Sequence, residues 1–158
     1  MNFLAYAFHN PLFVASACSW LVAQLSKTIL YMIINHKFCF ERIFGAGGMP
    51  SAHSATVCAL VVSTAVVYGP SGFEFPMAVF FAFIVMYDAM GVRRETGEQA
   101  KVLNEIVSQW FQMGNKLQSR DPMEQLKEFV GHTPLQVLIG AILGCSIAAI
   151  VCNAMHLM

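Results

Sequence analysis

The chain has 158 residues, of which 57% are hydrophobic and 11% charged, and its formal net charge is zero. Soluble domains carry about 25% charged residues, so this composition excludes an ordinary soluble domain and indicates lipid around much of the surface. The neutral balance argues against nucleic acid as a partner, because proteins that bind it concentrate positive charge.

The five cysteines are scattered along the chain without a C-x-x-C pair. Most of them lie inside apolar stretches, where a free thiol behaves as a small hydrophobic group. An odd, scattered set argues against a disulfide framework and against a structural metal site. We therefore expect a single domain over residues 1–158 that uses no metal and no cofactor.

Four apolar stretches follow one another along the chain, at residues 11–34, 51–68, 75–91 and 134–155. A helix of about 20 residues crosses the hydrocarbon layer, and the third stretch is only marginally long enough. The first stretch lacks the basic flank and cleavage site of a signal peptide. Gly140 and Gly144 give the fourth stretch a small-residue face that we expect to pack within the bundle. The sequence thus predicts an all-α, polytopic membrane helix bundle with about four transmembrane helices.

The nine lysines and arginines predict the orientation of these helices. With four crossings, all nine lie on one side: Lys27 near the end of the first stretch, and the others in the two connecting segments on that side. The positive-inside rule makes that side the cytoplasm and puts both termini outside. We expect residence in the plasma membrane, with membrane lipids as the surrounding partners.

Residues 95–119 predict a cytoplasmic amphipathic helix. Its apolar residues recur at steps of three and four: Leu103, Ile106, Trp110, Met113 and Leu117. One interpretation is that this stripe packs on the rest of the protein or lies in the membrane interface. The other is a coiled-coil seam between two copies, a homodimer. The short length, about two to three heptads, favours the first interpretation.

The start of the second apolar stretch carries the first candidate site. Pro50 suits the first turn of a helix, which places Ser51 and His53 at its cytoplasmic mouth. A helix N-terminus with unpaired backbone N–H groups suits an anion, and a histidine there can donate a proton to it. A capping serine beside an interfacial histidine explains the same residues about equally well.

The fourth stretch begins in a similar way. Thr133 can cap the helix and Pro134 can open it, so His132 is presented at the same cytoplasmic mouth. Gln136 lies four residues further on, where its amide can hold the imidazole. Two histidines at two helix starts can divide the roles of nucleophile and acid.

Cationic side chains accompany these histidines. Lys27 lies inside the first stretch, and Arg93 and Arg94 follow the third. A charge inside a membrane helix costs several kcal/mol, so it faces a partner or an aqueous site by default. Asp88 is the candidate counterion for Lys27. In the alternative interpretation, Lys27 extends its side chain to the membrane interface and the two arginines act only as topology signals. The histidines on the same side of the membrane disfavour this alternative.

These motifs resemble the type 2 phosphatidic acid phosphatase (PAP2) superfamily, to which the vanadium haloperoxidases are related. The resemblance rests on Pro50-Ser51-Ala52-His53-Ser54 and on His132 with Gln136 leading into the fourth stretch. Longer phrases at 86–94, 99–104 and 126–134 are similar to a divergent branch of small membrane proteins. That similarity extends over essentially the whole chain from Lys27 onward.

The resemblance implies a metal-independent phosphatase that acts on a lipid phosphate or diphosphate at the cytoplasmic membrane face. In the superfamily a histidine attacks phosphorus to form a phosphohistidine, and that role falls on His132. A second histidine protonates the leaving oxygen, and that role falls on His53. The phosphoryl oxygens are held by a serine and by basic side chains, which correspond here to Ser51, Lys27, Arg93, Arg94 and Lys127.

The chain departs from the superfamily pattern at its basic positions. An Arg-Pro pair is expected seven residues after Lys27, where the sequence has Ile34-Asn35. An arginine is also expected six residues before His132, where Leu126 stands with Lys127 beside it. The cation that replaces these arginines is therefore open.

A third departure concerns the nucleophile. Gln136 stands where an acidic residue usually orients the attacking histidine, and an amide fixes the tautomer without stabilising an imidazolium by charge. We expect slower turnover, or a different orienting acid such as Asp88. The departures also leave two alternatives open. One is a catalytically weak or inactive relative that binds or moves phospholipids, and the other is a structural partner that works through the amphipathic stripe.

Overall fold

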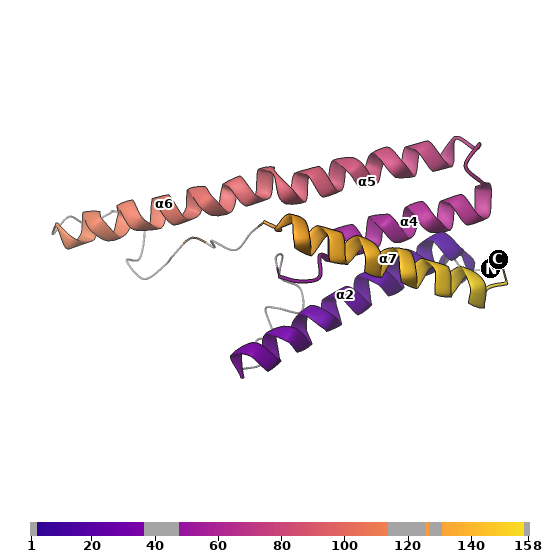
Figure 1. Cartoon of the computed structure of the whole chain (residues 1–158), viewed down its shortest axis with the longest axis horizontal. Helices are drawn as coiled ribbons and strands as arrows, with labels where there is room; N and C mark the ends of the chain where they lie inside the picture. Colours follow the sequence, from indigo (N-terminus) through magenta and orange to yellow (C-terminus); the bar gives the residue numbers. More distant parts are fainter. Residues whose placement is uncertain (1–2, 37–47, 114–125, 127–130, 157–158) are drawn as a thin grey trace.

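The computed structural model describes residues 3–36, 48–113, 126 and 131–156. Its helices are α1 (Phe3–His9), α2 (Pro11–Asn35), α4 (Ala52–Tyr68), α5 (Glu74–Met90), α6 (Val92–Gln112) and α7 (Pro134–Ala154). The described residues include no strand. Helices α2, α4, α5 and α7 lie alongside one another as a bundle, in which α4 contacts the other three (Figure 1).

The bundle has the lengths and the surface of a membrane protein. Three helical segments are long and apolar enough to cross a bilayer: Pro11–Asn35, Glu74–Trp110 and Pro134–Ala154. Helix α4 is apolar as well, with 17 residues. Large side chains such as Phe80, Ile142 and Ile150 face outward, as lipid-facing residues do. The predicted all-α membrane helix bundle is confirmed.

Small residues form the core between the helices. Ala15, Ala59 and Ala148, one each from α2, α4 and α7, are fully buried together. Along α7, a Cβ at Gly140 would collide with Ser51, and a Cβ at Gly144 would collide with the carbonyl of Ala55. Helices in lipid associate by such close packing of small residues. The expectation that these two glycines pack within the bundle is confirmed, and their contact holds the start of α7 against the start of α4.

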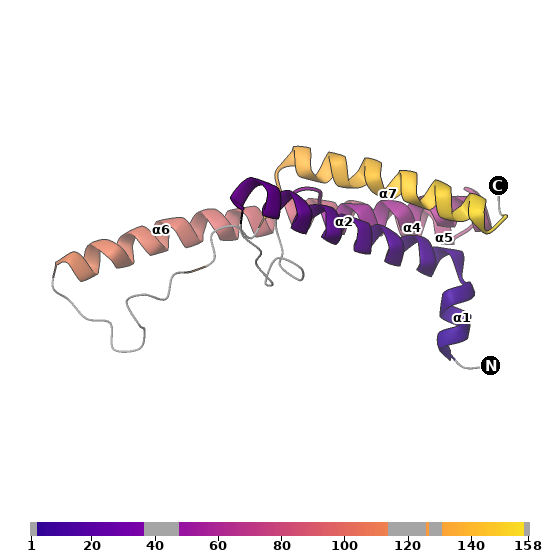
Figure 2. The same cartoon turned by 90° about the horizontal axis from the view of Figure 1, so that it is seen from below.

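Helix α6 continues α5 beyond the end of the bundle. Only Gly91 separates the two helices, and both views show α6 extending in the direction of α5, away from the other helices (Figures 1 and 2). Among the described helices α6 contacts only α5. Its apolar residues Leu103, Ile106 and Trp110 are exposed, and so is Met113 directly after the helix. The expectation that this stripe packs on the rest of the protein is therefore wrong for the described residues, while Leu117 lies outside them.

The two ends of the bundle differ. Helix α1, the C-terminal end of α7 and the connection between α4 and α5 lie at one end (Figures 1 and 2). The starts of α4 and α7 lie at the opposite end, toward α6. This arrangement brings the two histidine-bearing helix starts to the same end.

Candidate functional site

A backbone hydrogen bond joins the starts of α4 and α7. Ser51 precedes α4 as its N-cap, and its N–H donates to the carbonyl of Gln136 at 3.1 Å. The Oγ of Ser51 accepts from the Ser54 N–H at 3.3 Å and from the Ser54 hydroxyl at 3.0 Å. Ser51 is fully buried. The structure thus gives Ser51 the capping role that the sequence left open, and this role fixes where α4 begins.

The segment that carries His132 is held from the other side by the junction of α5 and α6. The backbone N–H of His132 donates to the carbonyl of Ala89 at 3.0 Å. Gly131 lies so close to the backbone of Arg94 that any Cβ there would collide with it. Only glycine permits this approach, which sets the His132 side chain at the mouth of the bundle with 3% of its surface exposed.

The two predicted histidines face one another across the joined helix starts. The ring centroids of His53 and His132 are 5.8 Å apart, and the rings are inclined edge to face at 65°. His53 is the second residue of α4, and His132 stands two residues before α7. At this separation both imidazoles can contact one small anion beside them.

Gln136 determines which nitrogen of His132 carries a proton. Its Oε1 accepts from the Thr133 N–H at 3.1 Å as part of a capping box, and the same oxygen lies 3.2 Å from Nδ1 of His132. Because the Thr133 N–H can only donate, the Gln136 atom must be the oxygen, and Nδ1 must donate to it. In the neutral ring the lone pair is then on Nε2.

The charge state of His132 follows from its surroundings. Burial lowers the pKa of His132 below its ordinary value, and the positive charges of Lys27 and Arg93 lower it further. Hydrogen bonding to Gln136 and to the Gly48 backbone acts in the opposite direction. A lowered pKa keeps the imidazole neutral at pH 7, the state in which a histidine acts as a nucleophile.

Lys27 reaches the same end of the bundle from α2. It is 5% exposed, and its alkyl chain packs on Gly48. A Cβ at Gly48 would lie 3.0 Å from Cδ of Lys27, and the φ of +82° there also favours glycine. Gly48 therefore makes room for the lysine chain, which places the predicted buried cation beside the histidines.

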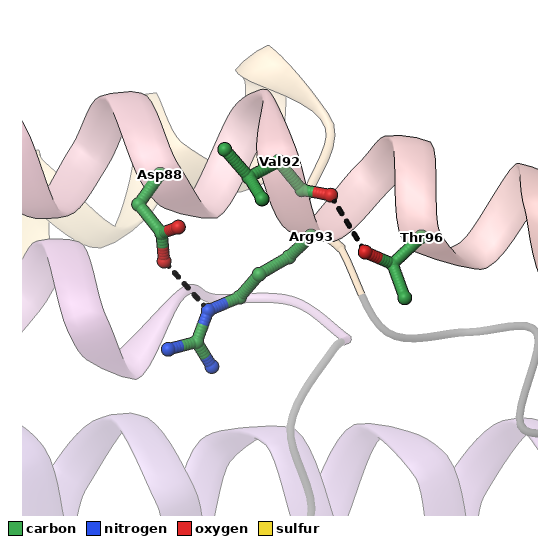
Figure 3. Close-up of polar contacts among 4 residues, drawn as sticks. All are labelled: Asp88, Val92, Arg93 and Thr96. Atoms are coloured by element: carbon green, nitrogen blue, oxygen red, sulfur yellow. Dashed lines mark hydrogen bonds and ion pairs between the residues drawn. The ribbon is translucent and has the colours of Figure 1, made fainter.

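Arg93 and Asp88 form an ion pair at the edge of the site. Nε of Arg93 lies 2.7 Å from Oδ2 of Asp88, and both side chains are partly exposed (Figure 3). The terminal guanidinium nitrogens point away from the α5–α6 ribbon (Figure 3). Asp88 is the expected counterion for Lys27, and the structure shows an ion pair between Asp88 and Arg93.

A pocket of about 590 Å³ opens beside His132, between the C-terminal end of α2 and the start of α6. His132, Thr133 and Gln136 line one wall. The residues of α6 that line the pocket are Arg94, Glu98 and Lys101. Lys101 and Glu98 form an ion pair, with 3.1 Å between Nζ and Oε1. Arg94 was a predicted site residue, whereas Lys101 was not. The spacing 94, 98, 101 marks one face of a helix and is the signal that could have revealed Lys101.

The pocket also bears on the missing superfamily arginines. Ile34 is 73% exposed, whereas the neighbouring Asn35 lines the pocket. Arg94 and Lys101 thus place positive charge on the α6 side of the pocket. Lys127, the remaining predicted cation, lies outside the described residues.

Comparison with known proteins agrees with the membrane architecture. The chain matches the profile of the divergent PAP2 family over residues 8–147. It is 35% identical over 137 residues to the "Uncharacterized membrane protein YuiD" of Bacillus subtilis (strain 168), an alignment that covers 83% of this chain and 87% of the relative. No solved structure matches the chain.

Proposed function

We propose that this chain, which belongs to the divergent PAP2 family, is a metal-independent phosphatase that removes phosphate from a lipid phosphate or diphosphate at the cytoplasmic membrane face. The observation that carries the proposal is the facing pair of imidazoles, His53 and His132, 5.8 Å apart at the joined starts of α4 and α7. Gln136 holds Nδ1 of His132, which leaves Nε2 as the nucleophile.

The reaction takes two steps. In the first, Nε2 of His132 attacks phosphorus while the bond from phosphorus to the leaving oxygen breaks, and protonated His53 gives its proton to that oxygen. In the second, water attacks the phosphohistidine and neutral His53 takes a proton from it. The electron pair of the N–P bond returns to Nε2, and inorganic phosphate leaves. The second step therefore restores both histidines to their starting states.

The surrounding charges are suited to the transition state. Phosphoryl transfer spreads negative charge over the equatorial oxygens, and stabilising that charge is the main catalytic task. Lys27 is buried beside the histidines, and Arg94 lines the pocket with His132. The guanidinium of Arg93 is held by Asp88 through Nε, which leaves its terminal nitrogens for an anion.

The position of the pocket supports a lipid as the substrate. The pocket lies at the mouth of an apolar bundle, so a headgroup can enter it while its acyl or isoprenoid tail stays in the hydrocarbon layer. The positive-inside rule puts this end in the cytoplasm.

A second candidate function is the binding or movement of phospholipids by a catalytically weak relative. It is favoured by the amide of Gln136, which contacts Nδ1 without a negative charge to stabilise an imidazolium. The exposed Ile34, at an expected arginine position, favours it as well. Such a protein retains the anion pocket but turns over little or no substrate.

Phosphate release by the purified protein in detergent tests the two functions. Wild type, His132→Ala and a matched control, His156→Ala, are compared on a panel of lipid phosphates and diphosphates with EDTA present. His156 is exposed at the far end of α7, so its loss leaves the site intact. If the protein is a phosphatase, wild type and His156→Ala should release phosphate and His132→Ala should release none. Phosphate release that is lost when EDTA is added contradicts the proposed metal-independent chemistry. Folded protein that binds lipid but releases no phosphate favours the second function.

A further inference from the structure

The exposed apolar stripe of α6 is not explained by the site. Leu103, Ile106, Trp110 and Met113 recur at steps of three and four, and Ile106 and Met113 are 55% and 75% exposed. Among the described helices only α5 contacts α6, and it does so at the junction of the two. A continuous apolar face of this kind marks an interaction surface.

Two features of α6 disfavour the membrane surface as its partner. The helix extends in the direction of the membrane-spanning α5, so it leads away from the bundle rather than across its end (Figures 1 and 2). Beyond Arg94, its ionisable residues through Gln112 are Glu95, Glu98 and Glu105 against Lys101 alone. Helices that lie on anionic membranes carry lysine and arginine on their polar face, and an acidic helix is repelled there.

We propose that α6 pairs with α6 of a second copy of this chain in a parallel, two-stranded coiled coil. Leu103 and Trp110 take the first apolar position of successive heptads, and Ile106 and Met113 take the second. Val102 and Val107 flank this seam on either side. Copies in one membrane share one orientation, so their α6 helices project in parallel and in register.

Membrane confinement compensates for the short seam. The described seam, from Leu103 to Met113, is only about 15 Å long, too short for a stable coil between free helices. Two chains held in the same membrane with their helices already oriented meet at a high effective concentration, which lowers the entropy cost of pairing. A short seam is then sufficient.

The seam and the pocket use different faces of α6. At 100° per residue, Arg94 and Lys101 lie roughly 150° around the helix from the centre of the seam. Both residues line the pocket beside His132. Pairing through the seam therefore leaves the pocket open, and the proposal stands independently of whether the pocket is catalytic.

Cysteine cross-linking in native membranes tests the seam directly. Ile106→Cys puts a thiol in the seam, whereas Ser108→Cys puts one about 200° around the same helix. The unsubstituted chain supplies the background from the native cysteines. We expect mild oxidation to give a disulfide-linked dimer of Ile106→Cys well above background, and Ser108→Cys to stay at background. Equal cross-linking of the two variants, or none above background, overturns the proposal.

Subunit counting in liposomes and a fluorescence measurement separate the remaining outcomes. Single-molecule photobleaching should count two subunits for wild type and for Ser108→Glu, and one for Ile106→Glu, which changes a residue outside the bundle. In a Trp20→Phe chain, Trp110 should resist quenching by brominated lipids. A monomeric wild type, or strong quenching of Trp110 by these lipids, overturns the proposal.

Discussion

At the residue scale, one side-chain oxygen of Gln136 serves both the fold and the site. It accepts from the Thr133 N–H at the start of α7 and from Nδ1 of His132. The capping box is readable from sequence, because Thr133 and Gln136 are three residues apart just before an apolar stretch. That the same oxygen also orients the ring depends on the path of the backbone from Gly131, which local patterns do not contain.

Two substitutions of Gln136 distinguish its role in orienting the His132 ring from the effect of a negative charge at that position. Gln136→Leu removes the acceptor for Nδ1, and we expect phosphate release to fall about 10–100-fold, as for other residues that orient a reacting histidine. Gln136→Glu keeps the acceptor and adds a negative charge, so it should raise the pKa of His132 and move the acidic limb of the rate profile to higher pH. Wild-type rates and an unshifted profile in both variants would exclude an orienting role.

The lowered pKa of His132 predicts the pH range in which the site is competent. The cationic form is disfavoured by burial and by the charges of Lys27 and Arg93. As pH falls, His132 should therefore stay neutral through its ordinary pKa of about 6.5 and gain its proton only below that value. Titration of histidine-labelled protein by NMR, with His132→Ala to assign the signal, measures this midpoint. A midpoint above 6.5 would contradict the environment described for the ring.

At the element scale, the contact between α4 and α7 positions both histidines. Gly144→Ala puts a Cβ onto the carbonyl of Ala55, so the helices must separate. Overpacking of this kind costs about 1–3 kcal/mol, and we expect a lower unfolding temperature together with lost phosphate release. Ala149→Val on the exposed face of α7 is the matched control. An unchanged unfolding temperature in Gly144→Ala would show that the contact is not tight.

Sequence patterns predict some helices of this fold better than others. The four bundle helices could be predicted because each is a long apolar stretch bounded by turn or capping residues. The relation of α6 to α5 could not, since Gly91 and the change in composition after it suggest a break, whereas α6 continues in the direction of α5. Lys101 was missed for the same reason, because its place at the pocket depends on where α6 begins and projects.

At the scale of the whole molecule, the orientation in the membrane can be tested without any assay of activity. Ser71 lies in the connection between α4 and α5, and Ser108 lies on α6, at opposite ends of the protein. An impermeant thiol reagent should label Ser71→Cys in intact cells and Ser108→Cys only after permeabilisation, because the cationic side faces the cytoplasm. The reverse pattern would put the site outside the cell.

The sequence predicts the class of the molecule but not the full composition of its site. Composition and charge asymmetry indicate a membrane bundle, and the motifs at 50–54 and 132–136 point to the pair of histidines. The cations that accompany them come from α2 and α6, which are far apart in sequence, so only the arrangement of the helices shows that Lys27 and Arg94 lie near His132. The spacing of the apolar residues predicts the amphipathic stripe of α6, whereas only the fold shows that this stripe is exposed.

The central claim is that Nε2 of His132 takes the phosphoryl group. The most direct measurement is rapid quenching of the reaction in base, where phosphohistidine survives, followed by mass spectrometry of the peptide that contains His132, with acid treatment as the control. The account predicts a phosphoryl group on His132 that forms within one turnover, is lost in acid and is absent from His132→Ala. Turnover of substrate without this species, or with the phosphoryl group on another residue, would contradict it.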